Sequence, residues 1–140
     1  MLNVFKYYTE PKDLSFVPSE KIPSHIIMYY ATNVINGRIK DAEKYILKNP
    51  HTAYTYADHV IMGRWPEAES VIMQNPNAAF NYAKHIINGR WIEAEKYIMK
   101  DPTYAFYYAR DIIKDRWEEA ESTIKEDPNW WIFYKDTFNL

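Results

Sequence analysis

Four arginines recur at a fixed interval of 26 residues, and their guanidinium groups are the first candidates for chemistry: Arg38, Arg64, Arg90 and Arg116. Evenly spaced guanidiniums could bind a row of phosphates or a carboxylate-rich peptide. Acidic residues follow each arginine three and five positions later, as Glu67 and Glu69 follow Arg64. Each arginine could pair in its plane with these carboxylates and donate hydrogen bonds to carbonyl groups at the end of the preceding helix. Both contacts would hold the turn between the helices in one conformation. We call the arginines at this repeated position the arginine column, and we expect them to have a structural role.

Tryptophans directly follow three of the arginines: Trp65, Trp91 and Trp117. A ladder of tryptophans could stack on bases or sugars. A large aromatic side chain at a repeated corner between helices more often packs in the core. We predict core packing.

Catalytic, cofactor and metal sites are not indicated. The chain has no cysteine, so it cannot form a thiolate metal site or use a thiol nucleophile. The histidines fall in two like-positioned pairs, His25 with His51 and His59 with His85, and stacked helices would hold each pair about 10 Å apart. Carboxylates recur in every copy, which is typical of scaffold residues, whereas a catalytic site should break the repeat at one place. We expect a protein that is not an enzyme and holds no cofactor.

These residues belong to an internal repeat that covers most of the chain. Residues 25–50, 51–76, 77–102 and 103–128 align without a gap, and eight positions are identical in all four copies. In the first copy these positions are Tyr30, Ala31, Ile35, Arg38, Ala42, Glu43, Ile46 and Pro50. A fixed period of this length is the signature of a repeat architecture.

Each copy predicts two short helices. Residues that can cap a helix precede the prolines at the start of the first helix: Asn49, Asn75 and Asp101, with Ser24 in the first copy. The first helix is expected to end on a left-handed residue at the glycine position, which holds Gly37, Gly63, Gly89 and, in the fourth copy, Asp115. Helices of about 12 and 9 residues are unstable alone, so the copies must stack.

The predicted fold is therefore an all-α solenoid of four helix–turn–helix repeats. Residues 1–23 contain Pro11, Pro18 and Pro23 and are expected to form an irregular N-terminal cap, with the solenoid over 24–128. Residues 129–140 keep the repeated tyrosine as Tyr134 and are expected to form a capping half-repeat. Alternatively, Trp130 or Trp131 is exposed there for docking.

Positions that vary between copies are the candidates for recognition. On the first helix they are the first, fifth, eighth and twelfth positions, which form one stripe at helical spacing. The stripe is polar and becomes more basic toward the C-terminal end. An ordinary solvated face is the alternative. The candidate partner-binding residues are Tyr29, Thr55, Asp58, Asn81, Lys84, Tyr107, Arg110 and Lys114.

Two segments, GRWPEAESVIMQNPNAAFNYA and GRWIEAEKYIMKDPTYAFYYA, carry a resemblance to a known family. They resemble short helical repeats found in uncharacterised proteins of tailed bacteriophages and large DNA viruses. The resemblance covers residues 25–128, and the first copy departs from it with Ile39 in place of Trp and Asp41 in place of Glu. It implies an α-solenoid of viral origin that acts on a host component, and it supplies no catalytic residue.

Composition limits the remaining function classes. Hydrophobic residues make up 47% of the chain, which argues against disorder, and the net charge of −2 argues against a nucleic-acid partner without excluding a local basic patch. No signal peptide or membrane span is recognisable, so we expect a cytoplasmic protein, in the host if viral. The leading hypothesis is a protein-binding solenoid that modulates or inhibits a host protein. The alternatives are an RNA- or DNA-binding repeat protein and a self-assembling structural protein. We expect the chain itself to be a monomer or a weak homo-oligomer formed through its end caps.

Overall fold

The computed structural model describes residues 23–140, and in this part of the chain every regular element is a helix. The first helix of each repeat, here called helix A, has an α-helical part and a π-helical part. These parts are α2 (Ser24–Tyr30) with η1 (Ala31–Ile35), α4 (Pro50–Tyr56) with η2 (Ala57–Ile61), α6 (Pro76–Tyr82) with η3 (Ala83–Ile87), and α8 (Pro102–Tyr108) with η4 (Ala109–Ile113).

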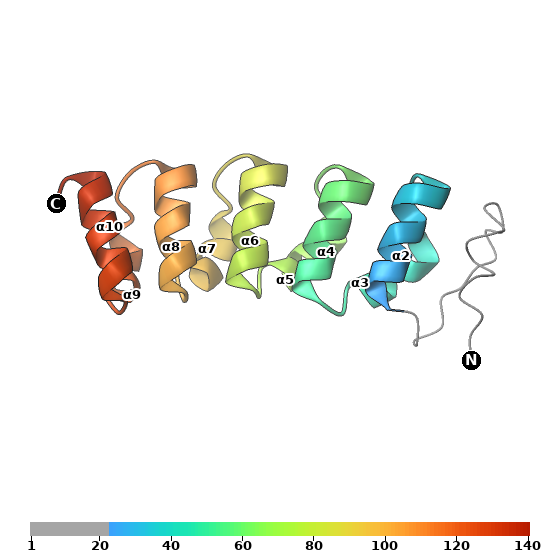
Figure 1. The fold of residues 1–140 in the computed structure, drawn as a ribbon, viewed down its shortest axis with the longest axis horizontal. Coiled ribbons are helices and arrows are strands. Elements are labelled where there is room, and N and C mark those ends of the chain that lie inside the picture. Colours follow the sequence, from blue (N-terminus) through green and yellow to red (C-terminus); the bar gives the residue numbers. More distant parts are fainter. Residues whose placement is uncertain (1–22) are drawn as a thin grey trace.

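The second helix of each repeat, helix B, is shorter than expected. The B helices are α3 (Lys40–Ile46), α5 (Pro66–Ile72), α7 (Ile92–Ile98), and η5 (Glu118–Ala120) with α9 (Glu121–Ile124). A final helix, α10 (Pro128–Phe138), occupies the position of a fifth helix A. The A helices stand side by side in one layer and the B helices form a second layer behind them (Figure 1). The all-α repeat fold predicted from the sequence is confirmed.

Side-chain caps begin the A helices where the sequence placed them, with one exception. The Asn49 side chain accepts hydrogen bonds from the backbone N–H groups of His51 and Thr52 at 2.9 and 3.1 Å, and Asn75 and Asp101 cap their helices in the same way. The prediction that Ser24 caps the first helix is wrong. Ser24 is already the first residue of α2, and Pro23, which precedes it, has no side chain that can accept a hydrogen bond.

The end of helix A also differs from the prediction. The left-handed residue lies one position before the glycines, at Asn36, Met62, Asn88 and Lys114, with φ between 53° and 61°. None of the glycines has a positive φ. The π-helical turn shifts the bonding: the Gly37 N–H bonds to the Ala31 carbonyl at 2.9 Å, six residues back. Asp115 therefore fits the glycine position without strain, because no left-handed backbone is required there.

Small and aliphatic residues from the repeated positions form the core. The alanines after the tyrosine and in helix B, and the helix B isoleucines, are fully buried in every copy, as Ala57, Ala68 and Ile72 are in the second. Alanine lets the backbones of neighbouring helices approach closely, so each helix A packs against the next helix A and against its own helix B. The predicted N-terminal cap lies outside the described residues apart from Pro23.

Candidate partner-binding surface

A hydrogen-bonded network joins each repeat to the next, and it uses most of the polar residues that are identical in all copies. In the first copy, Arg38 donates through Nε and Nη2 to both carboxylate oxygens of Glu43, at 2.7 and 2.8 Å. Tyr56, from the following repeat, donates its hydroxyl to Glu43 at 3.4 Å. The same hydroxyl accepts the backbone N–H of Ile39 at 2.8 Å. We call this set of contacts the inter-repeat clamp.

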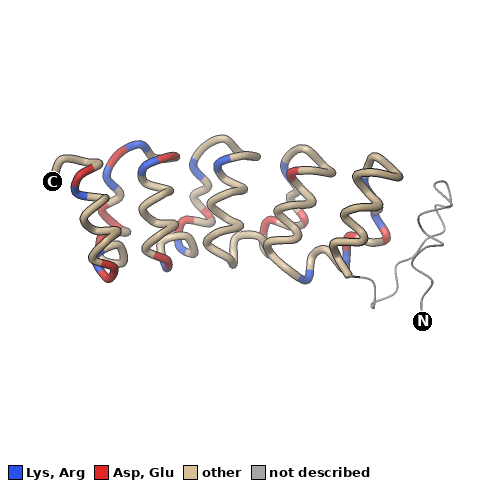
Figure 2. The backbone as a smooth tube through the Cα atoms, viewed as in Figure 1, with Lys and Arg blue, Asp and Glu red and all other residues tan. Residues whose placement is uncertain are grey.

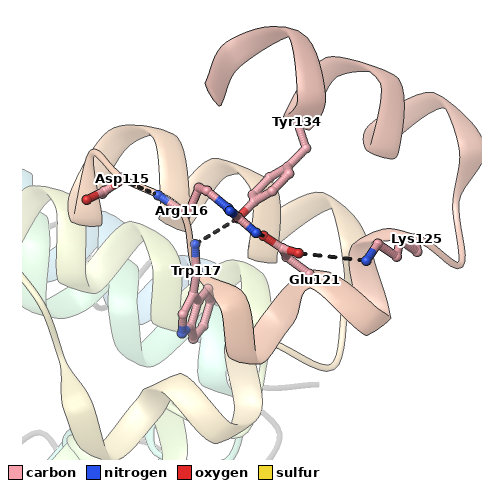
Figure 3. A network of polar contacts seen from close by, with 6 residues as sticks. All are labelled: Asp115, Arg116, Trp117, Glu121, Lys125 and Tyr134. Carbon is pink, nitrogen blue, oxygen red and sulfur yellow. Dashed lines mark hydrogen bonds and ion pairs between the residues drawn. The ribbon is translucent and has the colours of Figure 1, made fainter. Parts of the chain in front are cut away.

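The clamp recurs three more times. In the second, third and fourth copies the backbone N–H of the tryptophan donates to the next repeat's tyrosine hydroxyl at 2.7 Å. Figure 3 shows the last copy, in which Tyr134 of α10 closes the network between Arg116, Trp117 and Glu121. The four clamps are formed by Arg38, Glu43 and Tyr56; Arg64, Glu69 and Tyr82; Arg90, Glu95 and Tyr108; and Arg116, Glu121 and Tyr134.

Burial sets the electrostatics of the clamp. Tyr56 and Tyr82 are fully buried, and burial raises the pKa of each hydroxyl to about 12. The hydrogen bond from Arg64 lowers the pKa of Glu69. In the second clamp a neutral Tyr82 therefore lies against the ionised, arginine-paired Glu69, which is a stable arrangement.

Arginine–carboxylate pairing was thus predicted correctly in kind but only half correctly in detail. The carboxylates five residues after each arginine form the pairs, whereas those three residues after it, such as Glu67, are exposed and form no ion pair within the described chain. Residues two apart on a helix point to opposite sides, so only one of them can face the arginine and the next repeat. Among residues 23–140, none of these arginines forms the predicted hydrogen bond to a helix-end carbonyl. The tyrosine partner was missed, although its constant distance of 13 residues from the glutamate was visible in the repeat.

The tryptophan column is core, as predicted, and cannot act as a stacking ladder for bases. Trp65, Trp91 and Trp117 are at most 3% exposed. Each ring lies about 5 Å from the ring of the tyrosine in its own repeat, with centroid distances of 5.2, 4.9 and 5.1 Å. Its backbone N–H bonds to the tyrosine of the next repeat, so that Trp65 contacts both Tyr56 and Tyr82. The tryptophans therefore fill the corner behind the clamp.

The variable stripe in the first two repeats is locally satisfied. Thr55 donates its hydroxyl to the His51 carbonyl at 2.9 Å, within its own helix. Asp58 lies 3.5 Å from the ring of His59. Tyr29 is exposed over 48% of its surface. These three candidate residues are not brought together, and no lysine or arginine stands on this part of the stripe.

In the third and fourth repeats the stripe residues do converge. Lys84 of η3 reaches across to Asp111 of η4 at 2.8 Å, and Arg110 binds both oxygens of the same carboxylate. The Arg110 hydrogen bonds, with Lys84 beside them, lower the pKa of Asp111 to about 2. Lys114 lies at the end of the helix, where it lines a pocket of about 160 Å³ together with Lys84 and Asp111. Asn81 bonds to the Asn77 side chain and carbonyl at 2.8 and 2.9 Å.

An aromatic group lies beside these charges and runs over three consecutive A-layer helices. Tyr107 packs against Phe80 of the preceding repeat at 6.0 Å and against Trp130 of α10 at 5.2 Å. Phe133, one turn beyond Trp130, is 54% exposed. The Arg110 guanidinium lies over the Tyr107 ring at 4.9 Å and so joins the charged and aromatic parts. We call this group the outer aromatic cluster; its members are Phe80, Tyr104, Phe106, Tyr107, Trp130 and Phe133.

Sequence reasoning named Tyr107 as a candidate and Trp130 as an alternative, and it missed the other members because they lie off the chosen stripe or in the final half-repeat. The signal was the concentration of aromatic residues in 104–108 and 130–134. Trp130 and Trp131 are half-buried: Trp130 stacks on Phe106 at 5.4 Å and Trp131 on Tyr134 at 5.5 Å. Both rings are held by these contacts and both retain some exposed surface.

Other classes of site find little support over residues 23–140. No group of three histidine, aspartate or glutamate residues there is placed to hold a metal ion. No helix in the same range is long and apolar enough to cross a bilayer. Figure 2 shows that the A helices are uncharged over most of their length, with charged residues mainly near their ends.

Comparison with protein-family models, with curated proteins and with solved structures gave no match to this chain. The viral origin implied by the repeat motif therefore stays a prediction, and the case for function depends on the geometry above.

Proposed function

We propose that this protein is a non-enzymatic solenoid that binds another protein through the A-helix surface of its third and fourth repeats and α10. The observation that carries the proposal is the position of the outer aromatic cluster. Tyr107, Trp130 and the exposed Phe133 form a continuous apolar strip bordered by Lys84 and Arg110. Aromatic residues and arginine are the residue types most enriched at protein interfaces.

The contrast with the rest of the repeat supports this choice of surface. Side chains at the repeat positions that are identical in all copies take part in stacking or in the inter-repeat clamp. The stripe that differs between copies is free to differ because the stack does not depend on it. In keeping with the predicted viral origin, the partner we propose is a host protein whose activity is modulated or inhibited by being bound.

A nucleic-acid partner is the second candidate, and the arginine column would have to carry it. Each column arginine is partly exposed but already holds a buried or nearly buried glutamate through two hydrogen bonds. Bidentate binding of a phosphate through Nε and Nη2 would require that pair to break, which leaves a carboxylate without its counterion. This counts against the alternative.

Capture from lysate with matched variants tests the proposal. The tagged full-length chain is used beside Tyr107→Ala/Phe133→Ala, which alters the proposed surface, and Lys96→Ala/Lys100→Ala, which alters the B layer. We expect stoichiometric partners that the first variant loses and the second retains. Retention by both variants, or no partner at any salt concentration, would overturn the proposal. A single-stranded RNA titration at low salt that shows saturable binding would favour the nucleic-acid alternative, and a dimer in sedimentation would favour self-assembly.

A further inference from the structure

Positive charge on the A-helix stripe is confined to the half of the molecule that carries the outer aromatic cluster. The stripe of the first two repeats has one charged residue, Asp58, and no lysine or arginine. In the next two repeats it carries Lys84, Arg110 and Lys114. The neighbouring Asp111 is the only carboxylate that pairs with any of these three cations among the described residues. Cations therefore outnumber their carboxylate partners on this surface.

Arg110 and Lys114 also have hydrogen-bond donors that Asp111 does not use. Arg110 uses Nε and Nη2 on Asp111, and its Nη1 group has no partner within the described chain. Lys114 forms no ion pair there. Asp111 shows that this position binds a carboxylate. Arg110 and Lys84 together lower the pKa of Asp111 and keep it ionised well below its usual range. A second carboxylate, brought by a partner, would meet the remaining donors.

We propose that the segment bound at this surface is an acidic peptide with an apolar anchor, its carboxylates on Arg110, Lys84 and Lys114 and its apolar side chain on Tyr107 and Trp130. This inference rests on the protein-binding function proposed above and names the chemistry of the partner.

The extent of the surface sets the length of the bound segment. From α6 to α10 there are two steps between neighbouring A-layer helices, or about 20 Å at roughly 10 Å a step. An extended chain covers about 3.3 Å per residue, so about six residues span the distance. A nucleic acid would bring charge at every backbone unit, whereas this surface offers three cations beside an apolar strip. An acidic segment interrupted by an apolar residue matches that pattern more closely.

Anisotropy titrations with three labelled peptides of about eight residues test this proposal. One carries glutamates around a central Leu-Phe pair, the second has glutamine in place of glutamate, and the third has lysine. We expect the glutamate peptide to bind and to weaken as salt rises. We expect the glutamine peptide to bind about tenfold more weakly, the change that corresponds to one charge-assisted hydrogen bond, and the lysine peptide not to bind.

Variants then place the peptide on the surface. Arg110→Ala and Lys114→Gln should each weaken the glutamate peptide several-fold, with Arg110→Ala near tenfold, while Lys96→Ala in the B layer leaves binding unchanged. Lys114→Gln lies at an exposed helix end, so it retains a test if Arg110→Ala disturbs the cluster. Unfolding curves for each variant, compared with the unchanged chain, confirm that the fold is kept.

Four results would overturn the inference. The first is equal binding of the glutamate and glutamine peptides, and the second is undiminished binding by Arg110→Ala and Lys114→Gln. The third is an RNA oligonucleotide of equal charge that displaces the glutamate peptide at a similar concentration. Absence of binding by all three peptides would also reject the acidic segment. The proposed function would survive that last result if Tyr107→Ala/Phe133→Ala still lost its captured partners from lysate.

Discussion

Tyr82 and Tyr107 are the same residue type on neighbouring A helices, yet they belong to two different regions of the molecule. Tyr82 is fully buried and joins two repeats through its hydroxyl group. Tyr107 is half-buried and lies on the A-helix surface among other aromatic rings. The comparison teaches that stacking and surface recognition use separate positions of one repeat. The surface can therefore change from copy to copy without loss of the stack.

Removing each ring in turn tests whether the two tyrosines have different roles. Tyr82→Ala should lower the free energy of unfolding by about 3–5 kcal/mol, because it leaves a cavity in the core and removes a clamp. Tyr107→Ala should lower it by about 1 kcal/mol, since its ring contacts are partly exposed to solvent. Urea unfolding followed by circular dichroism measures both. Equal losses would mean that the outer aromatic cluster is part of the core.

A second substitution removes only the hydroxyl group of a clamp tyrosine and should have a smaller effect on the free energy of unfolding. Tyr108→Phe keeps the ring but leaves the backbone N–H of Trp91 and the carboxylate of Glu95 without their tyrosine partner. The free energy of unfolding should therefore fall by about 1–3 kcal/mol. Tyr104→Phe, whose hydroxyl accepts from Asn77 on the half-buried surface, is the matched control and should cost less than about 1 kcal/mol. A clamp that contributes nothing would make the two variants equal.

Alkaline pH should weaken the stack. Burial raises the pKa of Tyr82 from 10.0 to about 12 in the folded chain, so this hydroxyl favours folding fully below pH 10. That contribution is lost as pH rises from about 10 to about 12, because only the unfolded chain then releases the proton. Urea unfolding at about pH 9 and about pH 11 should show the decline. Tyr82→Phe should show a shallower one, and an identical slope would contradict the assignment.

Acidic pH should act on the A-helix surface in the opposite sense. The pKa of Asp111 is lowered from 3.8 to about 2, so its pairing with Lys84 and Arg110 is fully present above about pH 4. The contribution is lost as pH falls from about 4 to about 2, because in this range only the unfolded chain takes up the proton. Asp111→Asn should remove this part of the acid dependence, which unfolding at two acidic pH values measures.

The smallest expected effect concerns the helix ends, where the variable stripe meets the clamp. Met62 holds a left-handed backbone with φ 57°, whereas the first and third repeats place asparagine there. Met62→Asn should raise the free energy of unfolding by about 0.5–1 kcal/mol. Gly63→Ala should raise it by about 0.4–1 kcal/mol, because no atom lies within 4 Å of the added Cβ and φ is not positive. A loss of stability in Gly63→Ala would instead indicate that the left-handed backbone lies at the glycine.

The two regions were predictable to different degrees. The repeat, its two helices, three of the four caps and the buried tryptophans could be inferred because each is a local signal repeated along the chain. The misplaced left-handed residue shows a limit of such signals: glycine is the usual choice, but the π turn moved the position to Asn36 and its equivalents. Ser24 failed as a cap because α2 begins one residue earlier than the pattern suggested.

The period, the class of fold and the residues on which stacking depends follow from the amino-acid sequence alone, because identical side chains at identical intervals must meet identical surroundings in a stack. Only the tertiary structure decided which carboxylate each arginine takes, that a tyrosine from the next repeat completes the clamp, and that Lys84, Asp111, Arg110 and Tyr107 meet at one place. Those contacts join residues of neighbouring repeats or different elements. Their geometry depends on how one helix packs on the next, which the spacing of residues along the chain does not specify.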